Sequence, residues 1–298
     1  MKISYNWINE FLNTNIPYIK VSEMLTSIGL EVEGVEEFCS VKGGLKDVVV
    51  GEVLSCKKHP NADRLKVTQV NLGGEIVQIV CGAPNVDKDQ KVAVATVGSI
   101  LYDSKGNELK IKKTVIRGEE SNGMICAEDE LGIGDSHDGI IVLDNEITPG
   151  TPFSKVFEVE HDYIFNIGLT PNRADAMSHM GVARDLKALL SYNKVNFKWT
   201  FPEITKFKFD TINKSIPIDI QEPRLVDAYH GISITNVSIK KSPIWLQNKL
   251  KSIDITPKNN IVDITNYILH ELGQPLHAFD AKKINKGIIV KKFKGQKK

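Results

Sequence analysis

Between about residues 40 and 150 the chain alternates short apolar runs with glycine and Asn or Asp turns, and this pattern constrains the fold more than any other feature. The runs predict strands at Val48–Leu54, Leu65–Leu72, Glu75–Cys81 and Lys91–Val97. A Gly-Gly pair between the second and third runs supplies a two-residue hairpin turn. Short strands of this kind over ~100 residues predict a small closed β-barrel, such as the OB-fold, at residues 40–150.

Residues 1–39, which precede the barrel, have a different pattern. Apolar side chains recur at helical spacing from Trp7 onward, and Ser22 is predicted to cap a second helix that ends at Gly29. This segment is too short to bury a core of its own.

Residues 151–199 carry the complementary elements. A strand is predicted at Tyr163–Leu169, and a long helix with one apolar face follows, with Asp175 as its cap. We therefore expect residues 1–39 and 151–199 to form one discontinuous α/β domain, with the barrel inserted between its two parts.

A third region is predicted at residues 200–298. Strands are expected at Ile216–Ile220 and Gly231–Val237, and Ser242 followed by Pro243 is a typical helix start. Near the end of the chain, the apolar side chains Ile288, Val290 and Phe293 indicate a further strand.

The segment NNIVDITNYILHELGQPLHAFD, from Asn259 to Asp280, combines an apolar helix with polar groups. Apolar side chains recur at helical spacing, and the polar side chains on the opposite side of that helix are Asp263, Asn266 and His270. Gly273 and the proline two residues later predict the end of the helix, and His277 follows in an extended turn. A histidine between apolar neighbours is equally typical of a core or capping side chain, so spacing alone does not make His277 catalytic.

The overall charge excludes a strongly basic nucleic-acid binder. The formal net charge is +1, and 25% of the residues are charged. Eight lysines and no acid lie in Ala281–Lys298, which leaves a net charge of −7 on the remainder.

Cysteine usage and the N-terminal sequence indicate the compartment. The four cysteines form no Cys-x-x-Cys pair, which argues against a zinc knuckle or a disulfide framework and fits a reducing compartment. No signal peptide is recognisable, and no apolar run approaches the ~18 residues of a membrane span. We expect a cytoplasmic protein without a membrane partner.

Three motifs within the barrel region are similar to the tRNA-binding OB module of several aminoacyl-tRNA synthetases: HPNADRLKVTQVNLG, VCGAPNV and SNGMICAEDELGI. OB barrels bind nucleic acid with basic groups for the phosphates. The candidate RNA-binding side chains are Lys57, Lys58, Arg64, Lys66, Lys112, Lys113 and Arg117. Residues 48–150 nevertheless hold 11 basic and 16 acidic side chains, a net charge of −5, so structural docking remains an alternative to direct tRNA contact.

An acidic cluster in the same region comprises Glu119, Glu120, Glu128, Asp129 and Glu130. A magnesium site needs oxygens that converge on one point, which this spacing does not enforce. We expect a solvated surface there and no metal site in the chain. The chain also lacks a phosphate-binding glycine loop and an ATP signature, so no cofactor is expected in it.

The chain resembles the beta subunit of bacterial phenylalanyl-tRNA synthetase. The similar segments are MKISYNWINEFL, FNIGLTPNRADAMSHMGVARDL and NYILHELGQPLHAFD, and the resemblance extends from Met1 through Phe279 in the same order. It implies an α+β multidomain fold: an OB-fold barrel inserted in a small α/β domain, followed by a B3/B4-like editing domain that is incomplete at Lys298.

The family resemblance also implies partners and a reaction. An alpha subunit in an α2β2 tetramer would carry amino-acid activation with ATP and Mg²⁺, and tRNA(Phe) would be the RNA partner. The beta subunit hydrolyses tyrosyl-tRNA(Phe), and His277, Asn266 and Thr265 match positions that line this editing pocket. A carboxylate that completes the pocket comes later in family members, so no general base is assigned. The alternatives are a noncatalytic scaffold fragment and a freestanding OB-type RNA-binding protein.

Overall fold

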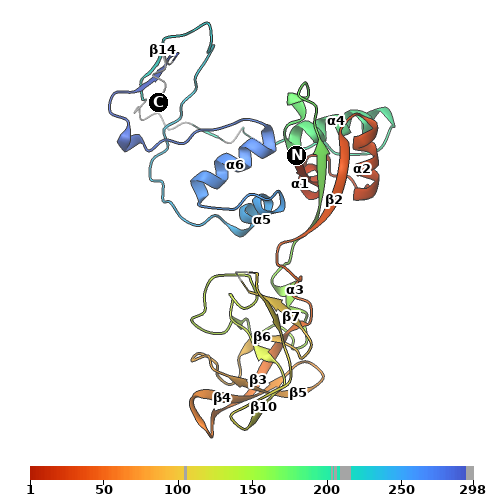
Figure 1. Ribbon diagram of the computed structural model, residues 1–298, viewed down its shortest axis with the longest axis vertical. Helices are drawn as coiled ribbons and strands as arrows, with labels where there is room; N and C mark the ends of the chain where they lie inside the picture. Colours follow the sequence, from red (N-terminus) through yellow and green to blue (C-terminus); the bar gives the residue numbers. More distant parts are fainter. Residues whose placement is uncertain (104–105, 203, 205–206, 209–215, 293–298) are drawn as a thin grey trace. The chain divides into compact units, whose positions relative to one another are not determined.

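The computed structural model describes residues 1–103, 106–202, 204, 207–208 and 216–292. The chain divides into two compact units (Figure 1). Unit 1 comprises Met1–Glu36 and Tyr163–Lys298, and unit 2 comprises Glu37–Asp162. This division separates a central segment from its two flanks. The four segments expected from the sequence, 1–39, 40–150, 151–199 and 200–298, stay predictions.

Unit 2 is built on one antiparallel sheet that contains the four predicted strands. These are β3 (Val48–His59), β4 (Ala62–Asn71), β5 (Ile76–Cys81) and β6 (Lys91–Ala95). The order is β11-β6-β3-β4-β5, and the short strands β11 (Met124–Ile125) and β12 (Val142–Leu143) both pair with β6. Among the described residues the ladder does not close on itself, so barrel closure and the OB-fold remain predictions.

Alternation along β6 explains why this sheet has apolar packing on both faces. Val92 and Val94 belong to one apolar cluster, and Ala93 and Ala95 belong to another that includes Phe153 of the short helix α3 (Phe153–Val156). Successive side chains of a strand point to opposite faces, so a continuous apolar run can contribute to two cores. Two small ladders complete the unit: β7 (Ile100–Tyr102) with β8 (Glu108–Lys110), and β9 (Thr114–Ile116) with β10 (Glu119–Ser121).

Unit 1 contains a three-stranded sheet of order β1-β13-β2. The strands are β1 (Lys2–Ser4), β13 (His161–Gly168) and β2 (Glu31–Cys39), and Figure 1 shows β13 in green beside β2 in red. Three helices, α1 (Tyr5–Leu12), α2 (Tyr18–Ser27) and α4 (His179–Tyr192), contribute side chains to one apolar core with this sheet. The first and middle parts of the chain therefore share a core.

Two predicted caps in unit 1 are wrong. Ser22 lies inside α2, which begins after Pro17, because proline fixes a backbone angle suited to a helix start. Asp175 lies in the short 3₁₀ turn η1 (Ala174–Ala176), where its carboxylate pairs with Arg173. The cap of α4 is Ser178, whose hydroxyl oxygen accepts a hydrogen bond from the Gly181 amide at 3.0 Å.

The later part of unit 1 contains the helices α5 (Ile244–Ser252) and α6 (Asn260–Leu272) and the turn η2 (Ala281–Lys283). It also contains one parallel pair, β14 (Ile218–Ile220) with β15 (Ile288–Val290). The predicted strand at 288–293 is thus present through Val290, while Phe293 lies outside the described residues.

Two other predictions for this part are wrong. Gly231–Val237 forms no strand, because its backbone has no ladder partner among the described residues and Ile234 is 77% exposed. Ser242 does not cap α5, since Pro243 occupies that position and the Ser242 hydroxyl instead donates to Asp263 Oδ2 at 2.5 Å.

Helix α6 begins and ends as predicted but buries its polar side. Asn259 Oδ1 accepts hydrogen bonds from the first amides of the helix, and Gly273 ends it with φ +76°. Asp263 is 0% exposed, whereas Ile264 is 48% exposed. Buried hydrogen bonds to carboxylates explain this inversion: Asp263 accepts from Ser242 and from the Lys258 amide, and Glu271 accepts from the Tyr267 hydroxyl at 2.5 Å.

Candidate functional site

The β3–β4 hairpin carries four of the predicted RNA-binding side chains. In its register Lys58 lies opposite Lys66, and Lys57 lies opposite Val67. Directly opposed residues share one face of a ladder, so Lys58 and Lys66 lie on one face and Lys57 on the other. Like charges directly opposite each other destabilise a sheet, so each of these two lysines needs an acceptor or an anion nearby.

Two of the seven predicted cations already have internal partners. Lys66 Nζ donates to the carbonyl oxygens of Val86 at 2.6 Å and Pro84 at 3.3 Å. Lys113 Nζ forms an ion pair with Glu120 at 2.9 Å. These two ammonium groups stabilise the local fold of unit 2, and we expect them to contribute less to RNA binding than the others.

The remaining five are Lys57, Lys58, Arg64, Lys112 and Arg117, and within the part of the chain that the structure describes their side chains form no ion pair. Arg117 lies in the turn between β9 and β10, and this turn is hydrogen-bonded to the β3–β4 turn. The His59 ring donates to the Ile116 carbonyl at 2.9 Å, and Asn61 Nδ2 donates to the Arg117 carbonyl at 3.1 Å. The fold thus places the two basic turns side by side.

Lys112 lines a hollow of about 640 Å³ in unit 2, together with Lys110, Ile111, Cys81, Glu130 and His137. Burial raises the pKa of the Cys81 thiol, so this thiol is protonated at neutral pH. The hydrogen bond from His137 to Asp129 raises the pKa of the His137 ring. The hollow combines an apolar lining with the cationic groups of Lys110 and Lys112. Among the described residues that line it, no nucleophile is hydrogen-bonded to a base, so we do not assign a catalytic site there.

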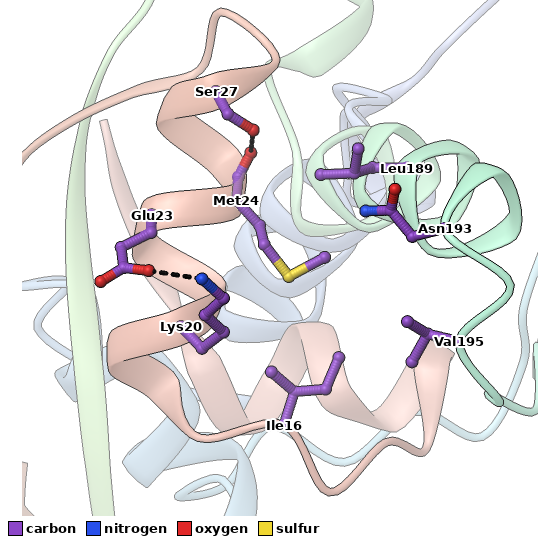
Figure 2. A pocket seen from close by; sticks show the side chains of 8 residues that line it. All are labelled: Ile16, Lys20, Glu23, Met24, Ser27, Leu189, Asn193 and Val195. Atoms are coloured by element: carbon purple, nitrogen blue, oxygen red, sulfur yellow. Dashed lines mark hydrogen bonds and ion pairs between the residues drawn. The ribbon is translucent and has the colours of Figure 1, made fainter.

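A second hollow, of about 530 Å³, lies in unit 1 (Figure 2). Met24 of α2 points toward Leu189 and Asn193 at the end of α4. The charged side chains at its edge, Lys20 and Glu23, form an ion pair with each other at 2.8 Å. This hollow presents no reactive group and lies apart from every residue selected from the sequence.

Two of the three predicted editing residues are neighbours on α6, and the third lies beyond the end of that helix. Thr265 Oγ1 donates to the Val262 carbonyl at 2.7 Å, which is a bond within its own helix, and Asn266 is half-buried on α6. His277 is exposed beyond the helix end, with its ring centroid 4.5 Å from that of Phe279. No hydrogen bond joins Asn266 to His277 within the described residues, so their joint role stays a prediction.

The sequence did not single out His179, whose pKa is shifted further from its ordinary value than that of any other described histidine of unit 1. Its ring is fully buried, accepts from the Ser4 amide at Nε2 (3.1 Å) and donates from Nδ1 to the His270 carbonyl (2.7 Å). It also stacks on Trp7, with ring centroids 3.9 Å apart. Burial lowers the pKa of His179 to about 3, so the ring is neutral and structural. Sequence spacing alone gives no sign of these contacts between distant segments.

The described residues hold no group of three or more His, Cys, Asp or Glu side chains arranged to bind a metal ion. Several members of the acidic cluster have other partners. Glu120 pairs with Lys113, Asp129 accepts from His137, and Glu130 accepts from the Ala127 amide at 2.7 Å. Mg²⁺ therefore does not fit this cluster as it is arranged. No described helix combines the length and apolar character needed to span a membrane.

Comparison with known proteins gives two family matches. Residues 48–152 match the family described as "Putative tRNA binding domain", and residues 225–298 match the B3/4 domain. Among solved structures, a MetRS related protein from Pyrococcus horikoshii is 21% identical, covering 35% of this chain and 85% of that one, with a TM-score of 0.26, a similarity too low to inform the fold.

Curated relatives match almost the whole chain. The phenylalanine–tRNA ligase beta subunit of Bacteroides fragilis (strain YCH46) is 52% identical over 98% of this chain and 36% of that protein. The beta subunit of Porphyromonas gingivalis is 48% identical over 94% of this chain and 34% of that protein. The matches define a chain that joins a tRNA-binding domain to a B3/4 domain.

The chain belongs to the phenylalanine–tRNA ligase beta-subunit family, which confirms the resemblance seen in the sequence. It spans about a third of the length of the curated relatives that it matches.

Proposed function

We propose that this chain contributes tRNA binding, scaffolding and part of an editing site to the beta subunit of phenylalanine–tRNA ligase. The observation that carries the proposal is the 52% identity to such a subunit over 98% of the chain. The ligase as a whole would use an alpha subunit, in an α2β2 tetramer, together with ATP and Mg²⁺. By the family resemblance we assign ATP and Mg²⁺ to the whole enzyme, and we expect it in the cytoplasm, where translation takes place.

For RNA binding, the supporting feature is the segregation of charge within an acidic domain. Residues 48–150 have a net charge of −5, yet the neighbouring β3–β4 and β9–β10 turns present Lys57, Lys58, Arg64 and Arg117 without internal ion pairs. A local basic surface can neutralise phosphates even where the domain is acidic overall. An OB-type closed barrel remains part of this proposal, because such barrels bind nucleic acid on a strand face.

For editing, the proposal concerns hydrolysis of tyrosine from tRNA(Phe). A pocket built for phenylalanine cannot strongly reject an analogue that adds a hydroxyl, so a second site that requires the hydroxyl corrects the error. Water attacks the ester carbonyl carbon, the bond to the terminal ribose oxygen breaks, and free tyrosine and the tRNA hydroxyl are released. Asn266, Thr265 and His277 would orient the ester and the water, and the general base is unassigned.

The experiment is hydrolysis of tyrosyl-tRNA(Phe) and phenylalanyl-tRNA(Phe) by the 298-residue chain and by its His277→Ala variant. Selective loss of tyrosine that the substitution abolishes supports the editing role. Absence of hydrolysis, together with a stable complex with an alpha subunit, favours the noncatalytic scaffold, which the internal pairing of Lys66 and Lys113 also supports. RNA binding with a steep salt dependence and no need for an alpha subunit would favour a freestanding binder.

A further inference from the structure

We propose that His59 and Asn61 are positioning residues that lock the Arg117 turn against the β3–β4 hairpin and so create one phosphate-binding surface on unit 2. We call Lys58, Arg64 and Arg117 the two-hairpin surface, because Lys57 points to the opposite face of the β3–β4 ladder. The inference rests on the proposed RNA-binding function and deepens it, because it names the residues that assemble the binding surface and the phosphodiester backbone of RNA as its ligand.

The hydrogen bonds that join the two turns come from side chains and belong to neither of the two backbone ladders. His59 is 5% exposed, and both ring nitrogens are engaged: Nδ1 accepts from the Asn61 amide at 3.0 Å, and Nε2 lies 2.9 Å from the Ile116 carbonyl. An accepting Nδ1 leaves the proton on Nε2, so a single neutral tautomer satisfies both contacts. Asn61 then donates from Nδ2 to the Arg117 carbonyl at 3.1 Å, and the tips of both hairpins lie at the same end of unit 2 (Figure 1).

The backbone of Arg117 is strained in a way that points to a role for its side chain. The register pairs Glu119 with Ile116, so Arg117 and Gly118 form a two-residue turn with φ of +51° and +98°. Glycine or asparagine suits the first position, whereas a residue with a long side chain is disfavoured there by steric strain. Asn61 holds the carbonyl of this strained residue, which fixes the direction in which the guanidinium leaves the turn.

The charges around the two turns favour an anion. Glu120 is paired with Lys113, and Glu119 accepts from Gln78 at 3.1 Å. Within the β3–β4 hairpin itself, Glu52 is paired with Lys91 at 3.0 Å, and Asp63 lies beside Arg64 in the sequence. Three cations joined on one rigid surface can contact successive phosphates, whereas the same cations on two independently moving hairpins would lose entropy on binding.

The test measures the binding of tRNA(Phe) transcript to the full chain at several salt concentrations. The variants are Arg117→Ala, Asn61→Ala and the double variant. Asn71→Ala is the matched control, because Asn71 Oδ1 accepts from the Gly73 amide at 2.9 Å in the β4–β5 turn, away from this surface. Thermal unfolding of each variant monitors the fold.

Arg117→Ala is expected to reduce the slope of log K against log salt by about one. Asn61→Ala is expected to produce a similar reduction, and the double variant should lose little beyond either single one, because Asn61 acts through Arg117. Asn71→Ala should leave the slope unchanged. A further variant, His59→Ala, should reduce the slope by the same amount as Asn61→Ala.

Additive losses in the double variant would overturn the positioning role, as would an unchanged slope in Asn61→Ala when Arg117→Ala reduces it. An unchanged slope in Arg117→Ala with RNA binding intact would exclude Arg117 from the surface. A chain that binds no RNA at all would overturn the proposed RNA-binding function, an outcome distinct from the failure of positioning alone.

Discussion

Buried His179 gives unit 1 a defined pH dependence. Its pKa is lowered from 6.5 to about 3, chiefly because burial disfavours the charged ring. In the unfolded chain the ring returns to its ordinary pKa and binds a proton below about pH 6.5. The stability contributed by the neutral ring is therefore fully present above pH 6.5 and is lost progressively as the pH falls toward 3.

The magnitude follows from proton uptake by the unfolded state. Between pH 7 and pH 5 a single site with these two pKa values loses about 2 kcal/mol of unfolding free energy. Any folded pKa below about 4 gives nearly the same loss, because at pH 5 the folded ring is almost entirely neutral in each case. Protonation would also place a second N–H against the Ser4 amide, which now donates to Nε2.

The assay compares urea unfolding of the chain and its His179→Gln variant at pH 7 and pH 5. Trp7 stacks on His179, so tryptophan fluorescence reports on this part of the core. Glutamine can accept from the Ser4 amide but does not titrate. His270, whose pKa is also lowered by burial, and the neighbouring charged groups Lys249, Glu10 and Glu271 are present in both proteins, so their effects largely cancel in the comparison.

The chain should lose about 2 kcal/mol more than the variant between the two pH values. Equal losses in the two proteins would refute the reasoning, since they would show that His179 binds its proton equally well in the folded and unfolded states.

Three further predictions concern stability. Arg117→Gly should stabilise unit 2 by about 1 kcal/mol in urea unfolding while weakening RNA binding, because glycine relieves the positive φ but removes the guanidinium; a destabilised variant would contradict the strain argument. Asp263→Ala should lower the free energy of unfolding by about 2–4 kcal/mol, since it leaves the buried Ser242 hydroxyl and the Lys258 amide without their acceptor. An unchanged thermal unfolding midpoint would disprove this. Gly51→Ala should cost about 1–3 kcal/mol, because its Cβ would lie 2.6 Å from Val70 Cγ1, whereas Gly74→Ala, with open space around it, should differ little from the parent chain in denaturant midpoint.

Local patterns identified the four longer strands of unit 2, β3 to β6, because apolar alternation and the Gly73–Gly74 turn are short-range features, but they did not identify the shorter strands β7 to β12. Tertiary contacts determined what the sequence missed. Ser22 was a plausible cap, but the chain enters the helix earlier, at Pro17. The Ser242 hydroxyl is bound by a carboxylate 21 residues away in sequence.

The candidate RNA site shows the same distinction. The basic residue types were visible in the sequence, whereas their pairing was not. Lys66 reaches carbonyl oxygens up to 20 residues away, and Asn61 reaches a carbonyl 56 residues away. These long-range bonds determine which cations are free to bind a phosphate. Composition does not show the bonds, so the sequence assigned all seven cations equally to RNA binding.

The contacts of His179 have a consequence for the order in which the chain folds during synthesis. Its ring binds the Ser4 amide, 175 residues earlier, and the His270 carbonyl, 91 residues later. A ribosome that has released only the first 200 or so residues has therefore supplied one of these partners and not the other. The segment Glu37–Asp162 has all of its own sheet by that stage and can fold first. Unit 1 completes its packing only after α6 has emerged, so its assembly is governed by chain elongation and loop closure as well as by contact energies.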